Sequence, residues 1–185
     1  MRELVTYHLV SLDGVAEEPG NWVFDVDEEV FAHLGAVIAR QDTVLLGRGT
    51  YDYWAGYWPG SDVEPFATFI NGTPKHVVTS RPLAPPWANS VVVDRSVVEH
   101  VRALKQGEGG DIGVHGSITL TRSLLRAGLV DELRLVVAPT IAGTGRRLFD
   151  DGELRRLDLI AVSGTRSGAL LLAYRTRAGG GGQSE

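Results

Sequence analysis

Short runs of β-branched and other apolar residues alternate along this chain with stretches of helical periodicity. The first run, ELVTYHLVS at residues 3–11, is apolar on both alternating faces, as in a central strand covered by helices on each side. From residue 157 the pattern changes to two apolar runs around GTRSG at 164–168, which predicts a β-hairpin. This order predicts an α/β fold, with a mostly parallel central sheet, an antiparallel C-terminal hairpin and helices on both faces.

The same periodicities give the expected element boundaries. Ser96 is expected to cap one helix, with Glu99 at the capping-box position. The expected strands are 3–11, 43–47, 75–80, 90–94, 111–115 and 131–139, followed by the two strands of the hairpin within 157–176. The expected helices are 25–41, 48–58 and 96–106, and one that follows Ser117.

The composition predicts a globular protein with one domain. The chain has 185 residues, 43% of them hydrophobic, so we expect one domain over 1–177 and a disordered Gly-rich tail at 178–185. A net charge of −5 does not suit a nucleic-acid-binding face, and no apolar run reaches the roughly 18 residues of a membrane span. Because the chain lacks cysteine and an apolar signal core, we expect a cytoplasmic protein without disulfides.

Three turns after predicted parallel strands carry residues that suit a phosphate. In LLGRGTY, Gly47 and Gly49 allow the backbone to approach a ligand closely. Arg48 adds a fixed charge, and Thr50 can cap a helix or bond a phosphate oxygen. A tight turn with a surface arginine would explain this stretch equally well.

The other two turns are VTSRP and VHGSITL. Thr79 and Ser80 beside Arg81 suit a 2′-phosphate, because a guanidinium pairs bidentately with phosphate. Gly116 removes a side chain where a pyrophosphate could lie, and Ser117 is expected to cap a helix whose N–H groups point outward. A polar loop and a capped helix without a ligand are the alternatives. Since the carboxyl ends of parallel strands share one edge of a sheet, the three turns together favour an extended, phosphate-bearing ligand.

With these motifs, the chain resembles the dihydrofolate reductase-like superfamily. Within it, the chain most closely resembles the C-terminal reductase domain of the bifunctional riboflavin-biosynthesis deaminase/reductase. The resemblance implies a dihydrofolate reductase-like fold with a central sheet of about eight strands. The matching pieces are SLDG (11–14), DTVLLGRGTY (42–51), KHVVTS (75–80), the stretch from VHGSITL to GTGRRLF (114–149) and the closing hairpin.

The resemblance implies NADPH as the cofactor and assigns its contacts by turn. The implied contacts are Gly47, Arg48 and Thr50 near the cofactor phosphates; Thr79, Ser80 and Arg81 at the 2′-phosphate; His115, Gly116, Ser117 and Ile118 around the pyrophosphate; Ser11, Leu12 and Asp13 near the nicotinamide; and Gly143 and Gly145 closing the site. NADPH supplies the hydride, so the protein has to place the acceptor next to it; a proton donor is an optional further contribution.

The resemblance also suggests residues for the substrate. Folate reductases hold the pterin with an acidic residue near the start of the first helix, and Asp27 aligns best with it. Asp27 is therefore the candidate catalytic residue, although an acid in a first turn also simply complements the helix dipole. Trp22, Phe31, Tyr51 and Trp54 are expected to contact a flat heterocycle with Asp27, or else to pack the core or a subunit interface.

The histidines give no sign of a metal site. They follow no ligand spacing such as HExxH, so we expect no bound metal. His8 and His76 lie in predicted strands and are interpreted as satisfied polar groups. His115, at a turn of the site, could have a pH-sensitive role.

Two departures distinguish the chain from the riboflavin-pathway reductases that it resembles. TYDYWAGYWPG stands where those enzymes have an Asp-x-Pro-like stretch, and His115 and Ser117 replace residues of their EGG turn. The leading hypothesis is an NADPH-dependent reductase that transfers a hydride to a small heterocycle. That substrate would be pterin-like or similar to 5-amino-6-(5-phosphoribosylamino)uracil. The alternative is a non-catalytic nucleotide-binding homodimer that kept the fold but lost turnover. We also expect the protein to form a homodimer, with GTGRRLF or the aromatic stretch as a candidate interface.

Overall fold

The protein was analysed as a computed structural model, which describes residues 1–150, 152 and 154–177. The predicted tail at 178–185 lies outside the described residues. The strands are β1 (Leu4–Ser11), β2 (Gln41–Gly47), β3 (Lys75–Val78), β4 (Ser90–Val93), β5 (Asp111–His115), β6 (Glu132–Ala138), β7 (Leu157–Gly164) and β8 (Leu170–Thr176). The helices are α1 (Glu28–Ile38), α2 (Arg48–Trp54), α3 (Phe66–Gly72), α4 (Val97–Gln106) and α5 (Ile118–Arg126), with short 3-10 helices at Pro19–Asn21 and Trp58–Gly60.

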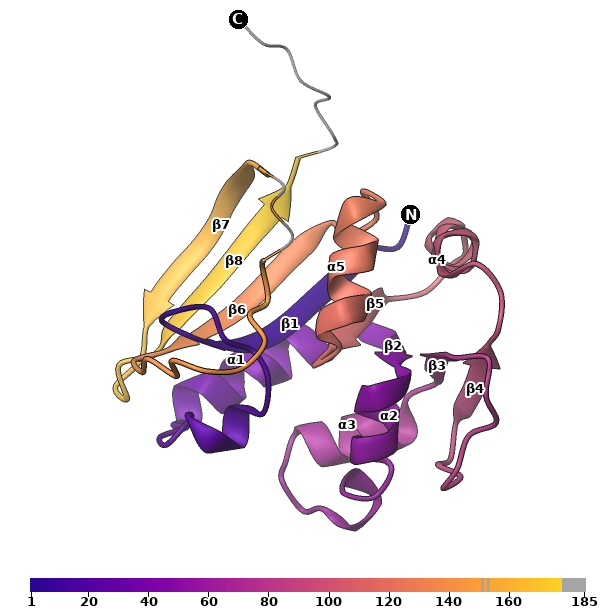
Figure 1. Ribbon diagram of the computed structural model, residues 1–185, viewed down its shortest axis with the longest axis horizontal. Coiled ribbons are helices and arrows are strands. Elements are labelled where there is room, and N and C mark those ends of the chain that lie inside the picture. Colours follow the sequence, from indigo (N-terminus) through magenta and orange to yellow (C-terminus); the bar gives the residue numbers. More distant parts are fainter. Residues whose placement is uncertain (151, 153, 178–185) are drawn as a thin grey trace, which may run out of the picture.

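All the strands named above belong to one eight-stranded sheet with the order β4-β3-β2-β5-β1-β6-β8-β7 (Figure 1). Neighbours from β4 to β6 run parallel, whereas β8 pairs antiparallel with both β6 and β7. The predicted mostly parallel sheet with an antiparallel C-terminal hairpin is therefore confirmed.

Helices cover both faces of the sheet, as predicted. Strand β1 is buried along nearly its whole length because its alternate side chains enter different cores. On one face, Leu4 packs with Val101 of α4 and Leu124 of α5. On the other face, Val5 packs with Val30 of α1. Figure 1 shows α5 in front of the sheet and α1 behind it.

Several element boundaries differ from the sequence expectation. Helix α1 begins three residues later than expected, because the Asp27 side chain accepts the first free N–H groups and caps it. Helix α2 ends at Trp54, before the 3-10 turn that contains Pro59. Helix α3 was not expected; it has seven residues, which is too short for a helical period to stand out. The expected cap of α4 by Ser96 is present.

None of the helices in the described part of the chain combines the length and the apolar character required to cross a membrane.

Candidate nucleotide-binding site

The predicted site segments follow five parallel strands that are neighbours in the sheet. In sheet order, residues 79–81 follow β3, 47–50 follow β2, 115–118 include the end of β5, 11–13 the end of β1, and 143–145 lie beyond β6. Because parallel strands end on the same side, all five segments lie along one edge. The topology thus gathers segments that are more than a hundred residues apart in the sequence.

Ser117 joins two of these turns. Its hydroxyl accepts a hydrogen bond from the backbone N–H of Gly47 at 2.9 Å and donates one to the hydroxyl of Thr50 at 2.9 Å. The expectation that Ser117 caps α5 was wrong, since this hydroxyl points across to β2 and no side chain caps the helix. Among the first-turn N–H groups of α5, that of Ile118 donates to the carbonyl of Gly116 at 3.2 Å, and none is bound by a capping side chain.

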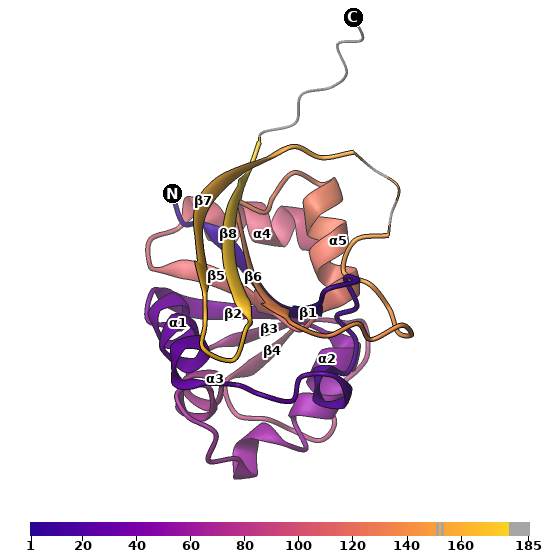
Figure 2. The ribbon, with the colours of Figure 1, turned by 90° about the vertical axis from the view of Figure 1, so that its left-hand side faces the viewer.

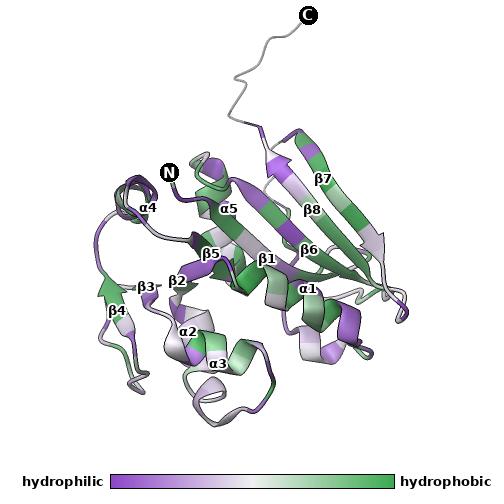
Figure 3. Cartoon of the chain, turned by 180° about the vertical axis from the view of Figure 1, so that it is seen from behind, coloured by the Kyte–Doolittle hydropathy of each residue, from purple (hydrophilic) through white to green (hydrophobic). Residues whose placement is uncertain are grey.

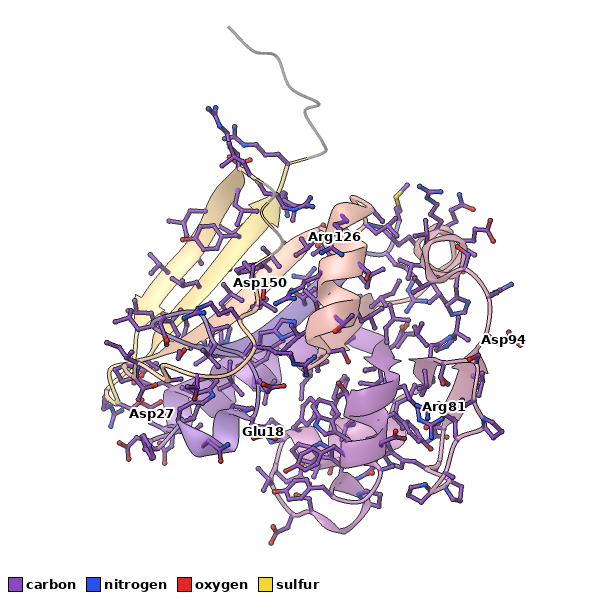
Figure 4. All side chains as sticks on the ribbon, viewed as in Figure 1. Glu18, Asp27, Arg81, Asp94, Arg126 and Asp150 are labelled. Carbon is purple, nitrogen blue, oxygen red and sulfur yellow. The ribbon has the colours of Figure 1, made fainter. Side chains whose placement is uncertain are left out.

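Arg48 joins the β2 turn to the loop after β3. Its Nε donates to Asp52 at 2.6 Å, and its Nη1 donates to the carbonyl of Pro82 at 2.8 Å. The backbone N–H of Arg81 donates to the Thr79 hydroxyl at 3.1 Å, while the Arg81 side chain is exposed. In the view of Figure 4, Arg81 lies between α2 and β4. An exposed cation beside hydroxyls fits an anionic group at this end of the site.

The glycines of the two central turns differ in what surrounds them. Gly116 has φ +66°, and a Cβ there would lie 3.0 Å from Cζ2 of Trp54. The expected free space for a pyrophosphate at this atom is thus filled by the indole, and a glycine is required for backbone conformation and packing. A Cβ on Gly49 would meet no atom within 4 Å. The open approach is therefore at Gly49.

Asp13 ties the loop after β1 to the loop after β6. Its carboxylate accepts hydrogen bonds from the Ser11 hydroxyl at 2.6 Å and from the N–H groups of Ala142 and Gly143 at 3.0 Å each. These bonds, the one from Ser11 first, lower the pKa of Asp13 to about 2. Leu12 beside it is 65% exposed, so it is the residue of this loop that reaches solvent.

The loop after β6 also needs glycine. Gly145 has φ +113°, and a Cβ on it would lie 2.8 Å from the buried side chain of Val15. This close approach seats the loop against the start of the chain segment that leads to Trp22. Gly143 also has a positive φ of +74°, but no atom lies within 4 Å of where its Cβ would be.

A cavity of about 410 Å³ opens beside these two loops. Trp22 is buried there, and its indole N–H donates to the carbonyl of Glu17 at 2.8 Å. The Glu17 carboxylate pairs with Arg146, whereas Glu18 accepts from Asn21 at 3.0 Å. The lining residues are Glu17, Glu18, Asn21, Trp22, Ala142, Thr144 and Gly145.

Asp27 has a structural role besides the predicted catalytic one. One carboxylate oxygen accepts from the N–H groups of Glu29 and Val30, and the other accepts from the N–H of Ser167 at 2.8 Å. The bond from Ser167 makes the largest contribution to lowering the pKa of Asp27 to about 2. Both carboxylate oxygens thus bind backbone N–H groups, and the predicted catalytic contact of Asp27 with substrate stays a prediction. Phe31 lies half-buried in the same helix.

The aromatic stretch after β2 packs only partly into the core, since Tyr53 and Tyr57 are exposed. Tyr51 is fully buried; its hydroxyl donates to the carbonyl of Pro85 at 2.8 Å and accepts from the N–H of Trp87 at 3.1 Å. The prediction that Tyr51 contacts substrate is therefore wrong. Trp54 is half-buried and meets Phe66 edge-on, with ring centres 5.5 Å apart.

Four of the five histidines, His8, His76, His100 and His115, bond to polar side chains, whereas the buried Nδ1 of His33 has no hydrogen-bond partner among the described residues. His115 bonds to the side chain of Gln41 at 2.7 Å, and burial lowers its pKa to about 3. His115 therefore stays neutral near neutral pH, and its suggested pH-sensitive role stays a prediction. His8 bonds Thr121 and His76 bonds His100, as interpreted from the sequence. Among the described residues, no cluster of acidic or histidine side chains could hold a metal ion.

Two contacts of the site were missed from the sequence. The Arg48–Asp52 pair was detectable, because residues four apart share a helix face. The bond between Ser117 and Thr50 was not, since it depends on β2 and β5 being neighbours.

The sheet order and the joined turns define a dihydrofolate reductase-like protein. Residues 3–171 match the RibD C-terminal domain, so the chain belongs to the RibD C-terminal domain family, which is related to reductases. It is 29% identical over 181 residues to the uncharacterized protein YyaP of Bacillus subtilis (strain 168), with 94% of each chain covered. It is 27% identical over 168 residues to the uncharacterized protein YwjB of the same organism, covering 89% of this chain and 91% of YwjB.

Solved structures show the same fold at low identity. A putative riboflavin biosynthesis protein from Shewanella sp. PV-4 superposes with a TM-score of 0.75 at 19% identity, covering 95% of this chain and 99% of that one. A pyrimidine reductase-like protein from Corynebacterium diphtheriae superposes with a TM-score of 0.68 at 18% identity, covering 95% of this chain and 92% of that one. The deaminase/5-amino-6-(5-phosphoribosylamino)uracil reductase of Thermotoga maritima superposes with a TM-score of 0.68 at 16% identity. The match covers 95% of this chain but 57% of that one.

Proposed function

We propose that this protein is an NADPH-dependent reductase that transfers a hydride to a small heterocyclic substrate. The observation that carries the proposal is the joined pair of turns at the ends of β2 and β5. There, Ser117 holds Gly47 and Thr50 while the first turn of α5 has no side-chain cap. Free N–H groups at a helix start suit phosphate oxygens.

The side chains at the carboxyl ends of the parallel strands fit a dinucleotide that carries a 2′-phosphate. The open space at Gly49 would admit a phosphate beside Arg48, and the exposed Arg81 with Thr79 and Ser80 would hold the 2′-phosphate. At the other end, Leu12 and the glycine loop at 143–145 would contact the nicotinamide. When bound, NADPH supplies the hydride, and the residues of the chain bind and orient it.

The cavity beside the nicotinamide end favours a pterin-like substrate over a phosphorylated one. Glu17, Glu18 and Asn21 line it with acceptors, and the lining set contains no cation. A ring with N–H donors would be satisfied there, with Trp22 as its flat neighbour, whereas a phosphate would face like charge.

Fluorescence titration of the four tryptophans with NADPH and with NADH tests the cofactor assignment. We expect NADPH to bind at least ~10-fold more tightly, which corresponds to about 1.4 kcal/mol. Equal affinities would remove the role given to Thr79, Ser80 and Arg81, and no binding of either would refute the reductase.

Turnover separates the reductase from the alternative, a nucleotide-binding protein that lost catalysis. NADPH oxidation would be followed with dihydrofolate and with the riboflavin-pathway intermediate as acceptors. The cavity chemistry predicts faster turnover of the pterin. Tight NADPH binding with no turnover of any flat heterocycle would favour the non-catalytic protein. The absence of cysteine from the sequence supports a cytoplasmic location, both for the reductase and for the non-catalytic alternative.

A further inference from the structure

The face of the sheet beneath α1 carries charged side chains where a helix-covered face is usually apolar. Figure 2 shows α1 on one side of the sheet and α5 on the other. On the α1 side, Asp111 of β5 and Glu132 and Arg134 of β6 line one cavity with Val5 of β1. In Figure 3, where α1 lies in front of the sheet, hydrophilic bands interrupt β6. Because burying polar groups costs free energy unless they are hydrogen-bonded, the polar groups of this face need partners.

The cavity has a volume of about 260 Å³ and lies between the sheet and the C-terminal half of α1. The helix contributes His33, Ala36 and Val37, and Arg40 follows its end. The strands contribute residues near their amino ends, whereas the candidate nucleotide site lies at their carboxyl ends. The two sites are therefore at opposite edges of the sheet. At roughly 30 Å³ per water molecule, the cavity has room for a small ring compound.

The charged groups of the cavity are already paired. Arg40 Nε lies 3.1 Å from Asp111 Oδ2. Both Glu132 oxygens accept hydrogen bonds at 3.0 Å, one from Arg134 Nε and the other from Arg175 Nη2. An ionic ligand would have to displace one of these partners and leave a charge unpaired. The cavity therefore favours an uncharged ligand.

Three buried polar atoms of this face have no hydrogen-bond partner among the described residues: Nδ1 of His33, the hydroxyl of Tyr7 and Nε2 of Gln41. His33 lines the cavity, and its ring centre is 5.8 Å from that of Tyr7. The Gln41 amide lies over Gly113, which is opposite Val5 in the register. Tyr7 and Gln41 are only 6% and 8% exposed. Buried polar atoms rarely lack a partner in folded proteins, so these three point to a molecule that the cavity receives.

We propose that the cavity binds a small uncharged cyclic amide, a ring in which a C=O group and an N–H group are adjacent. The three atoms without partners offer two donors and one acceptor. The amide oxygen would accept from the Tyr7 hydroxyl and the Gln41 N–H group, and the ring N–H would donate to Nδ1 of His33. The apolar part of the ring would contact Val5 and Val37.

The surroundings of His33 keep its imidazole neutral, as an acceptor at Nδ1 requires. Burial lowers the pKa of His33, and the positive charge of Arg134 lowers it further. A neutral imidazole carries one N–H group and one acceptor nitrogen. With the proton on Nε2, Nδ1 is the acceptor for the ring N–H.

An NMR chemical-shift titration of the isotope-labelled full chain with δ-valerolactam tests the proposal, which does not rest on the reductase function. We expect saturable shifts, at a Kd of about a millimolar, for the backbone amides of Val5 and of residues 33–37. The turns at 47–50 and 116–118 should not shift. The N-methyl derivative lacks the N–H donor and should bind at least ~10-fold more weakly. Equal affinities of the two compounds, or no saturable shift around the cavity, would overturn the proposal.

A pair of variants on α1 checks the location. Ala36 is exposed at the edge of the cavity, whereas Ala32, one turn earlier, is exposed outside the lining set. Ala36→Phe should fill the cavity and abolish the δ-valerolactam shifts, and Ala32→Phe should keep them. Shifts that persist in A36F would place the ligand elsewhere on the protein and refute the site.

A substitution of His33 separates a ligand site from a merely structural role. His33→Leu removes the unpaired Nδ1, so it should leave the Tm of the free protein unchanged or higher and weaken δ-valerolactam binding at least ~10-fold. His8→Leu is the control; it removes the bond to Thr121 at 2.9 Å and should lower the Tm. Unaltered binding by H33L, or a loss of Tm as large as that of H8L, would contradict the role given to His33.

Discussion

The hydroxyl of Ser117 donates a hydrogen bond to the hydroxyl of Thr50 at 2.9 Å, while the same oxygen accepts from the N–H of Gly47. One small side chain thus fixes the turn after β5 against the turn after β2. The spacing of the two turns is therefore set before any ligand arrives, so a bound phosphate would not have to order them.

Ser117→Ala should destabilise the fold by about 1–3 kcal/mol, because it leaves the partly buried N–H of Gly47 without its acceptor. Urea denaturation measures the change. Ser123→Ala on the same helix is the control, since its hydroxyl bonds only within α5. If S117A and S123A lost equal stability, the hydrogen bonds of Ser117 to Gly47 and Thr50 would contribute nothing to the stability of the fold. We also expect S117A to weaken NADPH binding.

Gly116→Ala and Gly49→Ala should have different effects on the stability of the fold. At Gly116, the positive φ and the 3.0 Å approach to Trp54 predict a loss of stability of about 1–3 kcal/mol. At Gly49, inside α2 with open space around it, alanine should leave stability unchanged or raise it by about 0.5–1 kcal/mol. Thermal unfolding separates them. Under the proposed function, G49A folds normally but binds NADPH more weakly; unaltered affinity would remove Gly49 from the site.

Asp27→Asn should lower stability at neutral pH and leave reductase turnover in place. The carboxyl pKa falls from 3.8 to about 2 on folding, so its stabilisation is present above pH 3.8 and is lost as pH falls toward 2. The difference in melting temperature between wild type and D27N should therefore shrink over that interval. A D27N variant that keeps its fold at pH 7 but loses all turnover would instead support the predicted catalytic role of Asp27.

Acidification below pH 6.5 should destabilise the protein through its buried histidines. Burial lowers the pKa of His115 to about 3 and that of His8 to about 4, whereas both take up protons near 6.5 when unfolded. The unfolded state thus binds more protons as pH falls, at up to about 1.4 kcal/mol per pH unit for each group. Urea unfolding at pH 7.5, 6 and 5 should give a shallower decline for His115→Gln. A His115 proton resonance titrating near 6.5 in the folded protein would contradict this.

The sequence predicted the architecture well because local patterns carry it. The apolar run at residues 3–11 and the GTRSG turn correspond to β1 and to the β7–β8 hairpin. Side-chain partners in the site depend instead on which strands are neighbours, and periodicity does not encode this. That is why Ser117 was expected to cap its own helix, and why Tyr51 was expected to face a substrate.

Strand β1 begins the chain yet lies in the sheet between β5 and β6, and its pairing starts with Leu4 opposite Ile112. During synthesis, β1 emerges from the ribosome long before its partners exist. The roughly 100 residues from β1 to β5 take about 5–20 s to translate at ~5–20 residues/s. An apolar strand with both edges unpaired for that long is a natural substrate for chaperones, so folding yield should depend on growth temperature more than the mature stability suggests.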